Sequence, residues 1–476
     1  MNNLFNPGSL KGTNNPVLET RPRPYEGWNV TPQPTVGFAW NPRVTSGLMG
    51  KLLAGDATVI RSSYSLRRWV TPQQFFWNSA ANYGAFYYQG YTSTPGINFT
   101  PGAVTLGANP SLNGDSLPPL TLSPPVYQPS APLSDFTFNT ATRLSGFAAN
   151  IKQPYTQSWN FGIQRRLPGN RVLEVRYNGN RTVHQWVALN TNQVNVLAGR
   201  PGEASFLDQF KQAQKNLNLN GGASFANSGL PGEAAIPVFE AAFAGAPAAS
   251  GFANSTFIQN LRQGEAARMA LALAGAGSAS ARYFCNLVGA GFGPCAKNLG
   301  YTGAGAGYPI NYFQANPFKT GEANPVSYLD SAGYATYHSA QVEFRQQVWH
   351  GLQFNANYTF SKNLGIDPGT NWEGQFAQFD LRDLGMSYMP TGFDRRHVFH
   401  FSPVYELPLG QGKPFVNQGG VVNKIVGGWT VSSIVTIQTG SPFRLTSGYW
   451  SIAQGGDSGV VLNGITAKDL QNSVGV

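Results

Sequence analysis

Apolar and polar side chains alternate without a break from Leu352 to Ser361, and almost without a break from residue 337 to 349. This alternation predicts two β-strands, each with one apolar and one polar face, joined by a tight turn at His350 and Gly351. Strands of soluble sheets are commonly about 5–6 residues long. Long alternating strands joined by short turns are typical of barrels in the bacterial outer membrane, where the apolar face contacts lipid and the polar face a wet lumen.

The alternation assigns each side chain of this strand pair to one of two faces. The residues expected to face lipid include Val342, Phe344, Phe354 and Tyr358. The residues expected to face the lumen are Gln341, Glu343, Arg345, Asn355 and Asn357. Similar patterns predict further strands at 35–40, 57–65, 155–167, 172–177, 395–407 and 428–438. We therefore predict an all-β fold, an antiparallel transmembrane β-barrel of which this chain supplies about eight or more strands.

The connections between these strands alternate in length along the chain. Tight turns follow Leu167 and Trp349, and connections of middling length occupy 41–56 and 408–427. The long connections are about 67–153, 190–335 and 362–394, followed by the tail after Gly440. Because outer-membrane barrels combine short periplasmic turns with long external loops, this order supports the barrel prediction. Helix-forming residues and an Asn-Ser cap predict short helices near 203–217 and 255–274 within the longest loop.

Composition narrows the functional class. Only 11% of residues are charged, against about 25% in a typical soluble domain, while 56 Gly and 33 Pro indicate many turns. No uninterrupted apolar run is long enough for a membrane-spanning helix. The net charge of +10 is scattered, with no dense basic stripe, so we expect no nucleic-acid partner.

The two cysteines, Cys285 and Cys295, lie in one Gly-rich stretch of the longest loop. A disulfide suits an exported loop in an oxidising compartment, with free thiols as the alternative. A metal site needs more ligands than these two thiols, and no histidine is near them in the sequence.

No segment carries a catalytic motif, so we expect neither an enzymatic activity nor a cofactor. Aromatic residues of the loop at 67–153 are candidates for stacking on a sugar or peptide ligand: Trp69, Phe75, Phe76, Trp77, Tyr87 and Tyr88. His397 and His400 are expected on opposite faces of one strand, which argues against a metal pair. Four acidic residues in the loop at 362–394 lack the spacing of an EF-hand: Asp367, Glu373, Asp380 and Asp383.

Four strings of the sequence resemble TonB-dependent receptors of the Oar-like type. They are PYTQSWNFGIQRRLPGNRVLEVRYNGNR (154–181), FRQQVWHGLQFNANYTFSKNLG (344–365), DRRHVFHFSPVYELPLGQGK (394–413) and GGWTVSSIVTIQTGSPF (427–443). The resemblance runs from about residue 30 to the end. It implies a barrel of roughly 22 strands with a plugged lumen. The implied partners are outer-membrane lipid and lipopolysaccharide, an unknown extracellular substrate, and the TonB energy-coupling complex through a plug that this chain does not contain.

We accordingly expect an irregular segment at 1–30 and a partial outer-membrane barrel domain at 31–476. The N-terminus has no apolar signal core, so we expect the chain to be a fragment of a longer gene product. The leading functional hypothesis is substrate binding and import across the bacterial outer membrane. The alternative is a surface-exposed adhesion or interaction protein anchored by the barrel, and a secreted β-rich hydrolase ranks last because no acid–base pair or nucleophile stands out.

Overall fold

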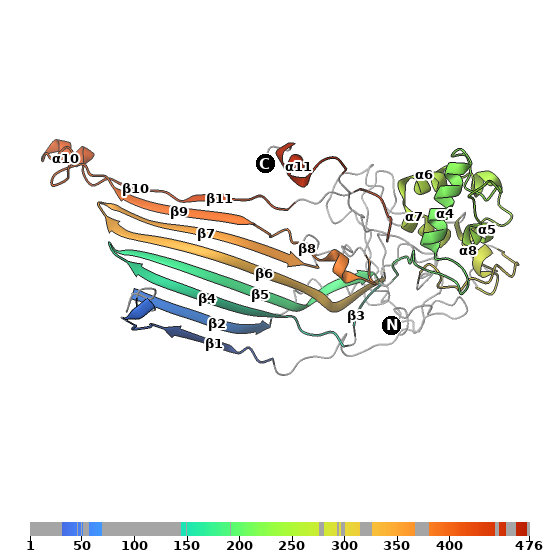
Figure 1. The fold of residues 1–476 in the computed structure, drawn as a ribbon, viewed down its shortest axis with the longest axis horizontal. Helices are drawn as coiled ribbons and strands as arrows, with labels where there is room; N and C mark the ends of the chain where they lie inside the picture. Colours follow the sequence, from blue (N-terminus) through green and yellow to red (C-terminus); the bar gives the residue numbers. More distant parts are fainter. Residues whose placement is uncertain are drawn as a thin grey trace, which may run out of the picture.

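A long antiparallel sheet and a helical segment at one end of it form the protein (Figure 1). The structure is a computed structural model of the 476-residue chain. It describes residues 31–44, 46–48, 50, 57–68, 144–148, 150–190, 192–275, 280–292, 295–296, 300–314, 326–366, 380–442, 447–453 and 463–473.

The sheet has eleven strands, with neighbours in the order β1-β2-β4-β5-β6-β7-β9-β10. In chain order the strands are β1 (Thr35–Trp40), β2 (Thr58–Arg68), β3 (Leu144–Phe147), β4 (Tyr155–Leu167), β5 (Arg171–Asn190), β6 (Val326–Trp349), β7 (Leu352–Gly365), β8 (Met389–Pro390), β9 (His397–Glu406), β10 (Thr430–Ser432) and β11 (Val435–Gln438). β11 also pairs with β9, β8 pairs with β7, and the short β3 runs parallel to β6. Among the described residues the sheet is open, because β1 pairs only with β2 and both β10 and β11 pair only with β9.

The register of the strands collects the apolar residues on one face. One row across the sheet consists of Trp40, Ile60, Ile163, Val175, Val342, Tyr358, Phe399 and Ile437. Six of these eight side chains are exposed, with Val175 at 47% and Ile437 at 63%, and the other two, Ile60 and Phe399, are half-buried. A contiguous apolar surface of this size marks contact with another apolar phase, which for such strands is lipid.

The neighbouring row lies on the other face and is polar from β4 to β11, with Val59 of β2 at its end. It consists of Gln164, Glu174, Glu343, Asn357, His400 and Thr436. Phe344 pairs with Ala356 on the apolar side, whereas Arg345 pairs with Asn355 on the polar side. The two faces predicted for the strand pair at 337–361 are therefore confirmed, and so is the predicted antiparallel sheet of long strands.

The connections differ in kind at the two ends of the sheet (Figure 1). The tight turns at 168–170 and 350–351 lie at one end, together with the connection that carries α10 (Val421–Val426). Gly169 (φ +80°) and Gly351 (φ +81°) adopt the left-handed backbone that these turns require. The helical segment lies at the opposite end, as the alternation of short and long connections predicts.

Two strands are much longer than the pattern predicts. β5 has 20 residues and β6 has 24, whereas a tilted strand crosses a membrane with about 9–11. The prediction stopped early because Asn178, Gly179 and Asn180 interrupt the alternation. Bulges follow at Val183/Gln185 and Gln185/Val187, beyond which the strands continue as an arm that carries the helical segment.

We call residues 192–314, which follow this arm, the external insert. Its helices are α4 (Phe206–Leu219), α5 (Pro237–Ala242), the 3-10 helix η3 (Ala248–Ser250), α6 (Ser255–Gln263), α7 (Ala266–Leu273) and α8 (Ser280–Val288). The helices predicted near 203–217 and 255–274 are present, the second split at Gly264 (φ +72°). Ser205 caps α4 by accepting from the Asp208 N–H, and Asn254 caps α6.

The external insert also contains the main hydrophobic core of the described chain. Its largest buried side chains include Phe206, Phe210, Phe225, Phe239 and Phe313. Several of these rings meet edge to face, for example Phe206 and Phe313 with centroids 5.1 Å apart. The sequence predicted short helices in a loop here, but not α5, α8 or a shared core.

Two further helices of the described residues are η4 (Leu384–Ser387) and α11 (Ala467–Ser473). None of the helices in the described ranges combines the length and the apolar character needed to cross a membrane as a helix.

Candidate functional site: the lumenal wall and the external insert

Four charged side chains of β5 and β6 form a network on the polar face of the sheet. Arg176 Nη2 lies 3.1 Å from Glu343 Oε2, and Arg345 Nη2 lies 3.4 Å from Glu174 Oε2. Each arginine also contacts the acid of its own strand, at 3.6 Å for Arg176 and 3.4 Å for Arg345. Asn355 of β7 donates to Glu343 at 3.2 Å, so the network joins three neighbouring strands.

The arrangement of these charges follows from the register. Glu174 and Glu343 are directly opposite each other, a position where like charges repel. The two arginines lie diagonally to the carboxylates and balance them, which leaves a group with no net charge. Unpaired charge facing hydrocarbon is costly, so this polar face is suited to line a water-filled passage.

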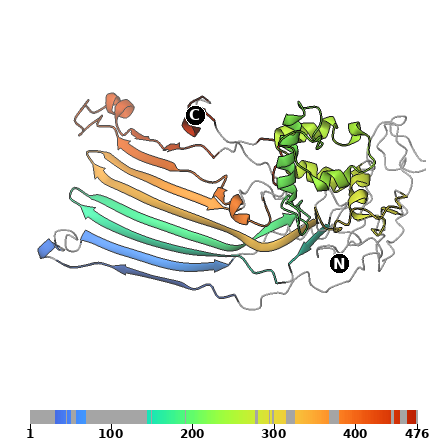
Figure 2. The same cartoon turned by 45° about the vertical axis from the view of Figure 1, so that its right-hand side comes forward.

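The external insert is closed at its base by contacts between its two ends. Asn195 N–H donates to the Phe313 carbonyl at 2.7 Å, and Gln314 Nε2 donates to the Asn192 carbonyl at 2.8 Å. Nearby, Tyr308 donates to Glu203 Oε2 at 2.7 Å. These contacts fix the base of the insert over the end of the β5–β6 arm (Figure 2).

Two buried tyrosines at this base have perturbed acidity. Burial and the hydrogen bond to Glu203 raise the pKa of Tyr308 well above its ordinary range. Burial, together with the nearby Glu203 carboxylate, raises the pKa of Tyr312 to about 12. Both phenols therefore stay protonated at any physiological pH and act here as packing groups with hydrogen-bond donors.

The segment after β11 docks on the insert through Trp450. Its carbonyl accepts hydrogen bonds from the Ala267 N–H at 3.0 Å and the Arg268 N–H at 3.3 Å. The Arg268 guanidinium stacks over the Trp450 indole, 4.3 Å from the ring centroid. The Glu265 carboxylate accepts hydrogen bonds from the Arg268 side chain, at 2.6 Å, and from the backbone N–H of Trp450. A segment about 180 residues away in the sequence thus contacts the insert at the start of α7.

The connection between β7 and β9 supplies a second tether. Leu381 N–H donates to Gln193 Oε1 at 2.8 Å, and the Arg382 guanidinium bonds the Asn195 side chain. Asp380 holds Arg382 in place with an ion pair of 2.6 Å. Segments from two other connections therefore contact the insert at this end of the sheet and hold it in position.

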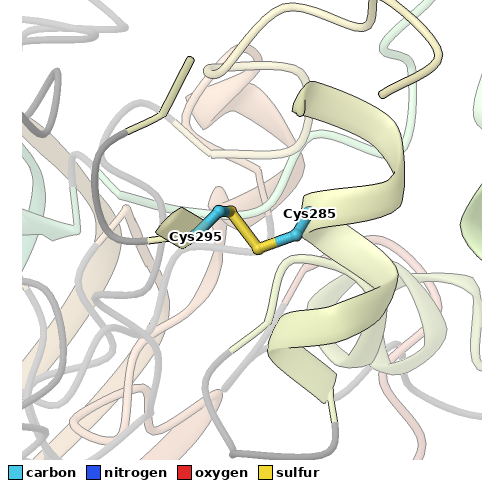
Figure 3. The surroundings of a disulfide bond; sticks show 2 residues. All are labelled: Cys285 and Cys295. Atoms are coloured by element: carbon cyan, nitrogen blue, oxygen red, sulfur yellow. A yellow bond between two sulfur atoms is a disulfide. The ribbon is translucent and has the colours of Figure 1, made fainter. Parts of the chain in front are cut away.

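Cys285 of α8 and Cys295 form a disulfide bond (Figure 3). Both side chains are fully buried and pack with Phe284 and Phe292 in a small cluster of their own. The bond closes the connection that follows α8.

The residues that the sequence suggested for ligands divide into two groups. The aromatic candidates all lie outside the described residues: Trp69, Phe75, Phe76, Trp77, Tyr87 and Tyr88. Asp367 and Glu373 lie outside them too, while Asp380 bonds Arg382 and Asp383 accepts from the Gly385 N–H at 3.0 Å. Within the described ranges no group of three or more His, Cys, Asp or Glu side chains is placed to hold a metal ion.

His397 and His400 lie on opposite faces, as their spacing predicts. His397 pairs with Phe360 on the apolar side and His400 with Asn357 on the polar side. At the start of the same strand Asp394 is buried and accepts from the Asn363 N–H at 2.6 Å. These groups make structural contacts within the sheet and near its end.

The sequence carried no signal for Trp450, Gln193 or Asn195, whose roles depend on contacts between distant segments.

The fold and the site together define a bacterial outer-membrane β-barrel wall with one lipid-facing side, one polar side and an external helical insert. The chain belongs to the family described as outer membrane beta barrel domain, which matches residues 3–473. Its place is therefore the bacterial outer membrane. No match was found among curated protein sequences.

One solved structure to which part of this chain is similar is the outer membrane transporter YddB from Escherichia coli. The similarity has a TM-score of 0.26 at 7% sequence identity. It covers 75% of this chain and 25% of the transporter chain, so the region compared is a quarter of that protein. A likeness this weak does not extend to what the chain binds.

Proposed function

We propose that the chain forms part of a TonB-dependent receptor that binds an extracellular substrate and imports it across the outer membrane. The observation that carries this proposal is the combination of a polar wall on one face of the sheet with an insert anchored at the external end of the same strands. An insert held there is in position to capture a solute, and the wall offers that solute a wet path. The strings that resemble TonB-dependent receptors supply the reason to choose energy-coupled import.

In this proposal the barrel wall is passive and performs no chemistry on the substrate. Entry is controlled by a plug within the lumen, which is moved by the inner-membrane energy-coupling complex. The network of Glu174, Arg176, Glu343 and Arg345 keeps the wall hydrated and stiff without attracting ions of one sign, because its charges balance. The tethers at Trp450 and Leu381 hold the insert in place during capture.

The test compares solutes removed from a complex medium by cells with and without the full-length gene. We expect one chemical class to be depleted only by cells that carry the gene, and we expect a protonophore to abolish that depletion. Deleting residues 200–308 should abolish it as well, while the barrel band on a gel persists. Identical depletion with and without the gene would overturn the proposal, and protonophore-resistant depletion would overturn the energy coupling.

A second candidate function is adhesion, with the barrel as anchor and the insert as the binding part. The specific observation in its favour is that the insert has a buried core and a disulfide of its own, as a rigid recognition domain does. The same deletion discriminates the two functions if cell attachment to host or abiotic surfaces is measured in parallel. Loss of attachment with unchanged uptake favours adhesion, and the reverse favours transport.

A matched variant separates the role of the insert from that of its position. Trp450→Ala removes the stacking partner of Arg268 and the packing of the indole on the insert. It keeps every buried side chain of the insert core and the backbone hydrogen bonds of residue 450. Transport that requires a positioned insert should fall in this variant, whereas adhesion by a freely presented domain should not.

A further inference from the structure

The balance of charge in the polar wall ends at β4. The strands β1, β2 and β4 contain no acidic residue, whereas β2 and β4 carry several arginines. The register places three of them on the lumenal side: Arg61 and Arg67 of β2 and Arg166 of β4. All three side chains are exposed, and none of the ion pairs among the described residues includes them. Within the described chain this part of the wall therefore carries uncompensated positive charge.

Arg61 lies at the depth of the membrane core. Its chain neighbour Ile60 belongs to the apolar row that crosses the sheet, so Arg61 is at nearly the same depth on the opposite, lumenal face. A charge at this depth is costly unless it meets water or a partner, and charged residues in such places commonly mark the path of a solute. Arg61 is therefore placed where a passing solute meets it.

The neighbours of Arg61 in the sheet leave its guanidinium without a partner. Arg61 is directly opposite Ala39 of β1 on one side and Gly162 of β4 on the other. Neither residue has a side chain that accepts a hydrogen bond. Beyond Gly162 lies Arg176, whose guanidinium pairs with Glu343. The five N–H donors of Arg61 are thus available to a ligand in the lumen.

Two carboxamides lie beside this guanidinium on the same face. Asn160 and Gln164 of β4 are on either side of Gly162, which makes them the diagonal neighbours of Arg61. Diagonal neighbours in a sheet are about 7–8 Å apart, within reach of long side chains. Carboxamides supply N–H donors, and a guanidinium fork binds carboxylate and phosphate groups through two parallel hydrogen bonds. This set of donors fits an anionic group.

We propose that Arg61, with Asn160 and Gln164 beside it, binds a carboxylate or phosphate group of the solute that passes this wall. Arg67 lies toward the external end of the same face and Arg166 toward the short-turn end, so both extend the attraction for anions along the wall. Arginines that line a pore select for anions in the same way. That the ligand is an imported solute rests on the proposed function, whereas the anion site itself is tested without transport.

The first test measures the electrostatic potential beside Arg61. The two cysteines of the chain form a disulfide, so Ser63→Cys introduces one free thiol two residues from Arg61 on the same face. Its reaction rates with an anionic and a cationic thiosulfonate of similar size are measured on the full-length protein in vesicles, at about 10 mM salt, where the Debye length is about 30 Å. A unit charge about 7 Å away in water changes the local concentration of a monovalent ion about threefold, in opposite directions for the two signs. Arg61→Gln should therefore lower the ratio of the anionic to the cationic rate by roughly sevenfold.

Two controls match this measurement. Arg165→Gln removes an arginine from the opposite face of β4 and should leave the ratio at Ser63→Cys within about twofold of its starting value. Thr359→Cys places the thiol in the same row of the sheet as Arg61 but on β7, about 19 Å away, and its ratio should not respond to Arg61→Gln. An unchanged ratio at Ser63→Cys after Arg61→Gln would overturn the proposal. A lack of reaction with both reagents would overturn it too, because protein would then cover this wall.

The second test measures binding of an anionic group at the same thiol. The reagent is N-ethylmaleimide, which is uncharged, and the competitors are citrate, glucose 6-phosphate and glucose. An anion held with a dissociation constant near 1 mM should slow the reaction at Ser63→Cys roughly tenfold at about 10 mM. Glucose should not slow it, and neither anion should act after Arg61→Gln.

Protection by citrate or by glucose 6-phosphate supports the site and identifies carboxylate or phosphate as the preferred group. Protection by neither anion, or equal protection by glucose, would overturn it. These outcomes are separate from the outcome for import. Protection without any import by cells contradicts the proposed function alone, and import without protection contradicts the anion site alone.

Discussion

Phe344 and Asn357 offer a matched pair for testing the lipid-facing and lumenal sides. Phe344 lies near the middle of the apolar rows and is directly opposite Ala356, the chain neighbour of Asn357. The two positions are therefore at the same depth but on opposite faces. Phe344→Arg places a cation against hydrocarbon and removes the contact with Phe354, whose ring centroid is 5.8 Å away.

We expect Phe344→Arg to lower the free energy of unfolding by about 2–4 kcal/mol, the range for arginine at the bilayer midplane. This corresponds to roughly a 25- to 700-fold change in the folding equilibrium. Asn357→Arg places the same side chain opposite Glu343, where an ion pair compensates it, so its effect should stay below about 1 kcal/mol.

The assay is folding of the full-length protein into lipid vesicles from urea, followed by gel mobility and tryptophan fluorescence. Equal destabilisation by the two variants, or a larger effect of Asn357→Arg, would refute the assignment of faces. Phe344→Ala is the control for lost packing alone, and it should be less harmful than Phe344→Arg.

Three further predictions concern the insert and the cross-strand packing. Replacing Cys285 and Cys295 by alanine should destabilise the insert by about 3 kcal/mol, because the disulfide closes a loop with a sequence separation of 10 residues. Limited proteolysis of this variant should then cut the insert and spare the barrel. The insert should lose stability as the pH rises from about 10 to about 12, because the phenol of Tyr312 ionises first in the unfolded chain and in the folded insert only near its raised pKa. Tyr312→Phe should reduce this loss in circular-dichroism titrations without abolishing it, because the pKa of Tyr308 is raised as well. Gly179→Ala should cost about 1–3 kcal/mol in urea titrations, since its Cβ would lie 2.5 Å from the Trp159 ring. Gly291→Ala, whose Cβ would meet no neighbour within 4 Å and whose backbone is not left-handed, is the control for a glycine-to-alanine change without a clash.

The sheet was predictable because alternation is a local signal. Val342 and Glu343 are neighbours in one strand, so they lie on opposite faces, and their difference in polarity shows this in the sequence without any distant contact. Strand ends were less predictable. Where Gly179 and Asn180 take the place of the alternating residues, the ladder continues because both β4 and β6 pair with this part of β5.

The external insert shows where local signals stop. The capping residues Ser205 and Asn254 predict the starts of two helices. No local pattern predicts that Phe206 packs against Phe313, which is more than 100 residues away in the sequence. Docking of Trp450 on α7 is equally long-range. The loop aromatics near Trp77 remain a prediction, since they lie outside the described residues.

The most direct test of the central claim is the accessibility of single spin labels along β7, placed one at a time from position 353 to 360 of the full-length protein in vesicles. Lipid-soluble oxygen and a water-soluble nickel chelate serve as the two relaxing agents. The account predicts that accessibility to oxygen peaks at Phe354, Ala356, Tyr358 and Phe360, and that accessibility to nickel peaks at the residues between them. A flat profile, or nickel peaks at the apolar positions, would contradict a wall with lipid on one side and a wet lumen on the other.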